Sequence, residues 1–166
     1  MNLRSQNEII SANRGMFLET IWLATGATIA LTLALSFITA QHVPFLFASL
    51  GGSTIFLFAL NQSSSAQPRA LFGGHLGGAA IGIVCYQSFG NELWVEVLAV
   101  VLTMLFMVVT KTLHPPAGAN PLIMVHSHAD FLSLLNPVGI GVLILFIVAL
   151  LWSRLHPAKK YPNKWW

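Results

Sequence analysis

The stretch from Thr20 to Pro68 contains no aspartate, glutamate, lysine or arginine. As one continuous helix, its 49 residues would extend about 74 Å, which is more than twice the roughly 30 Å thickness of a bilayer core. The stretch therefore has to fold back on itself in apolar surroundings. Charged residues make up only 8% of the chain and hydrophobic residues 55%, whereas roughly a quarter of an ordinary soluble domain is charged. The sequence predicts an all-α polytopic membrane protein.

The segment 1–16 is polar and precedes the first long apolar run. We expect it to form a short amphipathic or disordered lead-in, and a secretory signal is the competing interpretation. The apolar run is longer than a typical signal core, and Ile38-Thr39-Ala40 lacks the small residue at the minus-three position of a cleavage site. We therefore expect an uncleaved first helix over 17–40, a single transmembrane domain over 17–153 and a basic cytoplasmic tail over 154–166.

Two of the apolar segments are interrupted by residues that break helices. The segment 41–60 contains Pro44, Gly51 and Gly52, and the segment 112–124 contains Pro115, Pro116, Gly118 and Pro121. In the hydrocarbon region, irregular backbone survives only where it lines a cavity or is covered by neighbouring helices. We therefore expect the functional site of the protein in these two segments.

The basic residues help to decide how many times the chain crosses the membrane. If both interrupted segments cross, the protein has about six membrane-inserted helices, and all eight lysines and arginines lie on one side together with both termini. Lysine and arginine prefer the cytoplasmic side, so both termini are then expected in the cytoplasm, in a bacterial inner membrane. The alternative has four full spans with two re-entrant segments, and it places Arg69 and Lys111 outside. We prefer six crossings.

The halves 17–89 and 93–153 share one order of elements, in which an uninterrupted helix is followed by an interrupted helix and by a helix opened by proline. Halves of three crossings each form an inverted repeat, as in many transporters. The short helices would then begin near the midplane with their N-termini facing each other, which creates a site for a small anion without charged side chains. The residues expected at this site are Ser49, Gly51, Gly52, Ser53, Thr54, His114, Pro115, Pro116, Gly118, Ala119 and Asn120.

Three ionisable residues near these segments are candidates for gating or proton-linked groups, and each has a second possible role. Arg69 either binds an anion through two donors or holds the cytoplasmic end of a helix. Lys111 either raises the local anion concentration or extends to the lipid headgroups, and we favour the second role. His75 is either a hydrogen-bonded packing residue or a proton-responsive group. The small residues around it, Gly73–Gly78, predict close helix packing, and contact between protomers of a homo-oligomer stays open.

His126, His128 and Asp130 offer nitrogen and oxygen ligands within five residues, but no second cluster completes a tetrahedral metal site. We therefore expect no metal and no other cofactor. The sequence contains no nucleophile elbow, zinc-protease motif or phosphate-binding loop, so we expect no enzyme. The basic tail is interpreted as a topology signal and not as a nucleic-acid site, so the expected partners are the lipid bilayer and a small inorganic anion.

The stretch Leu113-His-Pro-Pro-Ala-Gly-Ala-Asn-Pro121 resembles the signature of the HPP family of integral membrane proteins, which is named for its His-Pro-Pro tripeptide. Phe47–Ser53 and Ala66–Arg69, followed by Gly73-Gly-His75, are similar to other recurrent positions of that family. The resemblance implies an anion transporter, because members with an assigned role are implicated in nitrite transport across plastid and cyanobacterial membranes. Nitrite is therefore the expected substrate. The alternative is a non-transporting membrane sensor or assembly subunit.

Overall fold

The computed structural model describes residues 3–38, 46–156 and 160–165, and all regular structure in these ranges is helical. The α-helices are α1 (Leu3–Phe37), α2 (Leu46–Phe58), α3 (Pro68–Phe89), α4 (Leu93–Thr110), α5 (Asn120–His126) and α6 (Ile140–Arg154). Shorter helical turns connect them, namely η1 (Ser64–Ala66), η2 (Pro115–Ala119), η3 (Phe131–Leu134) and η4 (Leu135–Gly139). The predicted all-α class is confirmed.

Among the described residues, three helical stretches are long and apolar enough to cross a membrane, Ala12–Phe37, Leu93–Thr110 and Phe131–Arg154. Helix α3 has 22 residues, which corresponds to about 33 Å, so its length also suffices. Helices α2 and α5 have 13 and 7 residues, fewer than the roughly 20 that a full span needs. The polytopic membrane class is thus confirmed, and the two short helices occur where the sequence interruptions predict them.

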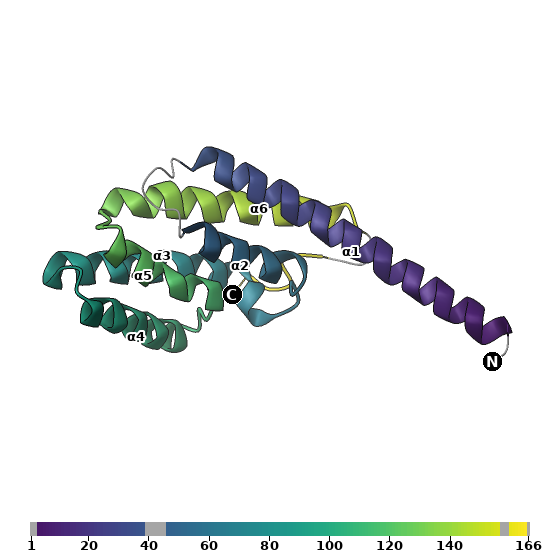
Figure 1. Ribbon diagram of the computed structural model, residues 1–166, viewed down its shortest axis with the longest axis horizontal. Coiled ribbons are helices and arrows are strands. Elements are labelled where there is room, and N and C mark those ends of the chain that lie inside the picture. The colour runs from purple at the N-terminus through teal and green to yellow at the C-terminus, as the bar shows by residue number, and fades with distance from the viewer. Residues whose placement is uncertain (1–2, 39–45, 157–159, 166) are drawn as a thin grey trace.

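Successive helices run in alternating directions through one bundle (Figure 1). The first turns of α1 extend beyond the other helices (Figure 1), so the lead-in is helical and continuous with the first span. Ala40 and Pro44, which were predicted to end this span and to interrupt the next segment, lie outside the described residues.

The two halves of the chain pack in the same way. Helix α1 contacts α2 and α6, while α4 contacts α5 and α3. Helix α2 also contacts α6, as α5 contacts α3. Exchanging α1 with α4, α2 with α5 and α3 with α6 therefore maps each of these contacts onto another. Because each half has three helices of alternating direction, the second half is inverted relative to the first.

The described basic residues that follow α1 lie at one end of the bundle. Arg69 lies in the first turn of α3, Lys111 follows α4 and Arg154 ends α6. These three positions share one end because the helices alternate in direction (Figure 1). Glu92 and Asp130 precede α4 and η3 at the other end. This is the distribution expected for six inserted segments, and the side of the membrane on which each end lies stays a prediction.

The C-terminal tail packs against the loop before α3. Tyr161 is buried, and its hydroxyl donates a hydrogen bond of 2.8 Å to the Ala66 carbonyl. Burial raises the pKa of Tyr161. The side-chain oxygen of Gln67 accepts from the backbone N–H groups of Asn163 and Lys164, at 2.9 and 3.2 Å. The tail is therefore fixed to the start of α3.

Candidate functional site

The beginning of α2 lies against η2, so the two interrupted segments meet. Ser49 Oγ, in the first turn of α2, donates to the Pro116 carbonyl at 2.9 Å. A Cβ atom added at Gly52 would lie 3.1 Å from the Pro116 Cβ. Glycine at this position therefore permits the close approach of α2 to the His-Pro-Pro segment.

Helix α3 receives the His-Pro-Pro segment on a face of small residues. A Cβ added at Gly74 would lie 3.0 Å from His114 Cβ, and one added at Gly82 would lie 2.7 Å from Pro121 Cα. These glycines are eight residues apart on one helical face, as the spacing of small residues predicts. The face places His75 beside the two interrupted segments.

Five polar side chains from these elements form a buried cluster, which we call the serine–histidine cluster. They are each at most 1% exposed: Ser49, Ser53, His75, His114 and Asn120. Ser53 Oγ lies 2.7 Å from His75 Nε2 and 2.8 Å from His114 Nε2. The centroids of the two imidazole rings are 5.1 Å apart. One hydroxyl of α2 therefore bridges a histidine of α3 and the histidine of the His-Pro-Pro tripeptide.

The donors and acceptors of the cluster give its hydrogen bonds one consistent direction. The Ser65 carbonyl, 2.6 Å from His114 Nδ1, can only accept, so Nδ1 carries the proton and Nε2 accepts. The Asn120 amide nitrogen, 3.0 Å from His75 Nδ1, can only donate, so the proton of His75 is on Nε2. His75 then donates to Ser53, and Ser53 can donate to His114. Both histidines are satisfied in the neutral form.

Two features leave the hydrogen bonding of this cluster incomplete. The Ser49 carbonyl lies 2.9 Å from Ser53 Oγ and competes with His114 for the single hydroxyl proton. The amide nitrogen of Asn120 also donates to the His75 carbonyl at 3.1 Å, while its Oδ1 atom is buried without a hydrogen-bond partner among the described residues. An unpaired buried acceptor costs about 1–3 kcal/mol. The cluster is therefore under-satisfied at Asn120, inside the predicted site.

The backbone of η2 offers fewer donors than the sequence suggests. Pro115 and Pro116 have no N–H group, and the N–H of Ala117 donates to the His114 carbonyl at 3.0 Å. The N–H of Asn120 donates to the Ala117 carbonyl. The polar groups on the η2 side of the cluster are therefore mainly side chains.

Several residues predicted for the site lie outside the serine–histidine cluster. Gly51 and Thr54 line a groove between α2 and α1, and the Thr54 hydroxyl donates to the Leu50 carbonyl at 2.8 Å. Pro115 is exposed, and a Cβ added at Gly118 would meet no atom within 4 Å. The predicted set is thus divided between a central cluster and its surroundings.

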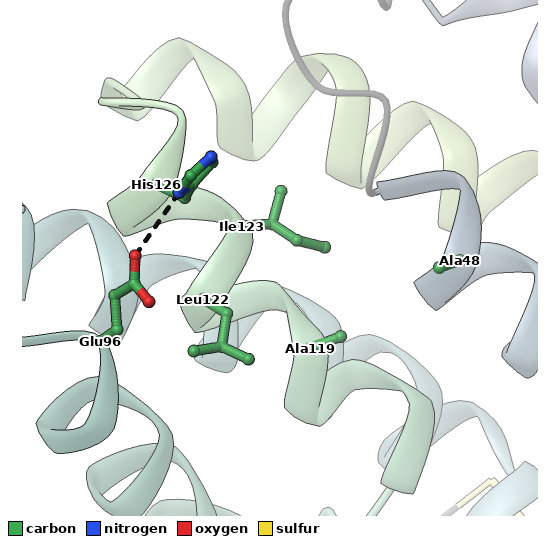
Figure 2. A pocket seen from close by; sticks show the side chains of 6 residues that line it. All are labelled: Ala48, Glu96, Ala119, Leu122, Ile123 and His126. Atoms are coloured by element: carbon green, nitrogen blue, oxygen red, sulfur yellow. Dashed lines mark ion pairs between the residues drawn. The ribbon is translucent and has the colours of Figure 1, made fainter. Parts of the chain in front are cut away.

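Ala119 lines another groove, which Figure 2 shows. Its volume is about 330 Å³, and its walls are largely apolar; it is lined by Ala48, Glu96, Ala119, Leu122, Ile123 and His126. His126 Nδ1 lies 3.6 Å from the Glu96 carboxylate, and the two side chains face each other at one side of the groove (Figure 2). His126 is well exposed, so this contact contributes little to stability.

The three gating candidates have different surroundings. His75 belongs to the cluster itself. Arg69 donates from Nη2 to the Thr110 carbonyl at 2.6 Å, so it satisfies the C-terminal end of α4. Lys111 is exposed and has a left-handed backbone with φ of 57°, which ends the helix. The Arg69 side chain and the Lys111 backbone therefore both hold the end of α4.

His126, His128 and Asp130 have separate contacts. His126 faces Glu96, as described above, and the His128 ring stacks on Tyr86 with 5.1 Å between centroids. Asp130 accepts from the Ser133 N–H at 3.2 Å. Within the described ranges no group of three or more histidine, cysteine, aspartate or glutamate residues could hold a metal ion.

Sequence reasoning missed two parts of the site. The Ser65 carbonyl, which fixes the His114 ring, lies 49 residues away in a polar loop and has no sequence signal. His75 was placed among the gating candidates, although Gly74, Gly78 and Gly82 mark the α3 face beside it. That glycine spacing was the available signal.

The bundle and its closed polar centre define a polytopic α-helical membrane protein with two short helices meeting at a buried cluster. The sequence profile of the family described as HPP, transmembrane region, matches residues 12–162. The chain belongs to this family.

Two curated transmembrane proteins of Dictyostelium discoideum are similar to the chain. One is 34% identical over 131 residues, which cover 74% of this chain and 42% of the relative. The other is 33% identical over 130 residues, which cover 73% of this chain and 45% of the relative. The chain thus spans less than half the length of these relatives. No solved structure matches the chain.

Proposed function

We propose that the protein is a transporter or channel for a small monovalent anion, with nitrite as the leading substrate. The observation that carries the proposal is the serine–histidine cluster, where α2, η2 and α3 bring five buried polar side chains together. Polar and ionisable groups inside a membrane bundle are costly and mark substrate or proton paths. Transporters also place their central sites at broken helices of inverted repeats.

The cluster supplies the donors that a small anion requires. The hydroxyl of Ser53 and the N–H groups of His75 Nε2 and Asn120 Nδ2 come from α2, α3 and α5, and each is hydrogen-bonded within the cluster. An anion that displaces Ser53 takes over the N–H of His75 as its donor. Since the cluster residues are at most 1% exposed, the packing of α2 against η2 has to loosen before the anion enters. The structure described here thus corresponds to a closed state of the proposed path.

The charge distribution supports the proposed orientation. The basic end of the bundle, with Arg69, Lys111 and Arg154, is placed in the cytoplasm together with both termini. We place the protein in a bacterial inner membrane, so that the path would connect the periplasm with the cytoplasm.

Nitrite uptake into liposomes that contain the purified protein tests the proposal, with an internal pH dye to follow protons. Asn120→Leu should abolish uptake but preserve insertion, because it removes the donors to His75. Thr103→Val is the matched control, since Thr103 is buried in α4 and its hydroxyl has no partner among the described residues. Passive entry of protonated nitrite is subtracted with empty liposomes.

Normal flux in Asn120→Leu contradicts the site. A wild type that moves neither nitrite nor any other small anion tested contradicts transport. The non-transporting sensor or assembly subunit then becomes the better explanation, and it is favoured by the tight burial of the cluster.

A further inference from the structure

A third groove lies between α3, α4 and the C-terminal tail, at the basic end of the bundle. Its volume is about 790 Å³, within the range of about 300–1,000 Å³ for ligand pockets. Residues that line it include Arg69, Phe72, Leu76, Phe106, Thr110 and Trp165. We call it the Arg69 groove.

The walls of the Arg69 groove are apolar along its length. Phe72 and Leu76 come from α3, and the ring of Phe106 in α4 lies directly over Gly77. A Cβ at Gly73 would lie 2.5 Å from the Thr112 methyl group. Gly73 and Gly77 are therefore occupied by contacts within the chain, which leaves no pair of free glycines for a partner helix at this face.

One end of the groove is positively charged. The guanidinium of Arg69 has five N–H donors, and among the described residues it makes one hydrogen bond, to the Thr110 carbonyl. In the part of the chain that the structure describes, Arg69 forms no ion pair with a carboxylate. Thr110 and Thr112, whose hydroxyls are 2.7 Å apart, line the groove near it, and the exposed Lys111 lies between them.

The tail builds the remaining side of the groove. The Trp165 ring packs against Phe146 of α6, with 5.9 Å between centroids. The backbone of Asn163 and Lys164 is fixed to Gln67, the residue before α3. Tryptophan favours the interface between headgroups and acyl chains. The groove therefore carries an interfacial aromatic residue, Trp165, at the same end as the Arg69 cation.

We propose that the Arg69 groove binds an anionic glycerophospholipid, with its phosphate on Arg69 and one acyl chain between α3 and α4. The groove is an apolar cleft with an unpaired cation at one end. A phospholipid matches this arrangement, because its apolar acyl chains end in a negatively charged phosphate. Basic pockets between transmembrane helices bind anionic headgroups on the cytoplasmic side. The lipid stabilises the start of α3 and the tail, and this role does not depend on what the serine–histidine cluster transports.

Native mass spectrometry of the full chain, with phosphatidylglycerol or phosphatidylcholine added, tests the proposal. Wild type should bind phosphatidylglycerol about tenfold more tightly, and Arg69→Gln should lose this preference. Both lipids carry the phosphate, but the choline cation of phosphatidylcholine is repelled by Arg69, and about 1.4 kcal/mol of such repulsion corresponds to tenfold in affinity. Leu76→Gln should weaken both lipids. Arg154→Gln, at the same end of the bundle, and Leu105→Gln, on the exposed face of α4, are matched controls that should leave binding unchanged.

Equal binding of the two lipids by wild type, or an equal loss in Arg154→Gln, overturns the proposal. If Arg69→Gln fails to fold, equal lipid retention by Leu76→Gln and Leu105→Gln overturns it instead. A dimer that persists without lipid and that Leu76→Gln dissociates assigns the groove to a second copy of the chain.

Discussion

The Ser53 hydroxyl lies 2.8 Å from His114 Nε2, which joins α2 to the His-Pro-Pro tripeptide across 61 residues of the chain. The same oxygen lies 2.7 Å from His75 of α3. Three elements thus depend on one side chain.

Ser53→Ala should lower the free energy of unfolding by about 1–3 kcal/mol, because it leaves the ring nitrogens of both histidines unpaired in a buried place. Thermal unfolding in detergent measures the change. Ser36→Ala is the control, since Ser36 is exposed and its hydroxyl donates only to the Thr32 carbonyl of the same helix. Equal stability of the two variants would refute the bridging role of Ser53.

His75→Leu and Asn120→Leu should not be additive. Both Asn120 hydrogen bonds go to His75, so either substitution removes the same side-chain contact. A double-mutant cycle on unfolding free energy should give a coupling of about 0.5–3 kcal/mol. Additive effects would mean that the two residues act independently.

Gly82→Ala and Gly51→Ala should have opposite effects. At Gly82 the new methyl group would lie 2.7 Å from Pro121 Cα, and overpacking of this kind costs about 1–3 kcal/mol. At Gly51 no atom lies within 4 Å, and alanine should stabilise α2 by about 0.5–1 kcal/mol. The same unfolding assay compares them, and a neutral Gly82→Ala would contradict the close approach of α3 to Pro121.

The docked tail should detach at high pH. Burial raises the pKa of Tyr161 in the folded state, so its contribution is fully present below the unfolded value of about 10 and is lost as the pH rises through the higher folded value. Limited proteolysis of the tail between neutral pH and about pH 11 measures this loss. Tyr161→Phe should weaken the tail by about 1 kcal/mol through the lost bond to Ala66 and should remove the pH dependence that Tyr161 causes.

The two ends of the bundle should face opposite sides of the membrane. In a Cys85→Ala background, Asn91→Cys at the acidic end should react with an impermeant maleimide in intact cells, because the basic end is expected in the cytoplasm. Ser64→Cys at the basic end should react only after permeabilisation. The reverse pattern would invert the proposed orientation.

Part of the fold follows from residues that act through composition and chain length. The uncharged run Thr20–Pro68 requires at least two apolar segments, and the prolines of 115–121 shorten α5 whatever surrounds them. The shared order of elements in the two halves is matched by corresponding helix contacts. These properties are local or periodic, so the sequence carries them directly.

The sequence does not show which residues meet at the candidate site. Gly51 and Gly52 are adjacent in sequence, yet Gly52 contacts Pro116 while Gly51 faces a groove beside α1. Consecutive helical residues point about 100° apart, and the sequence does not state which neighbour each face meets. The same reason explains why His75 joins Ser53 and His114 while Thr54, next to Ser53, does not.

The membrane class, the places where helices break and the membership of the HPP family follow from the amino-acid sequence alone. Which polar groups meet depends on the tertiary structure, because the bonds from His75 to Ser53 and from His114 to Ser65 join residues far apart in the chain. The tertiary structure also placed the tail on the loop before α3 and thereby completed the Arg69 groove. Helix formation depends on local residues, whereas a buried polar cluster depends on how the faces of several helices pack against one another.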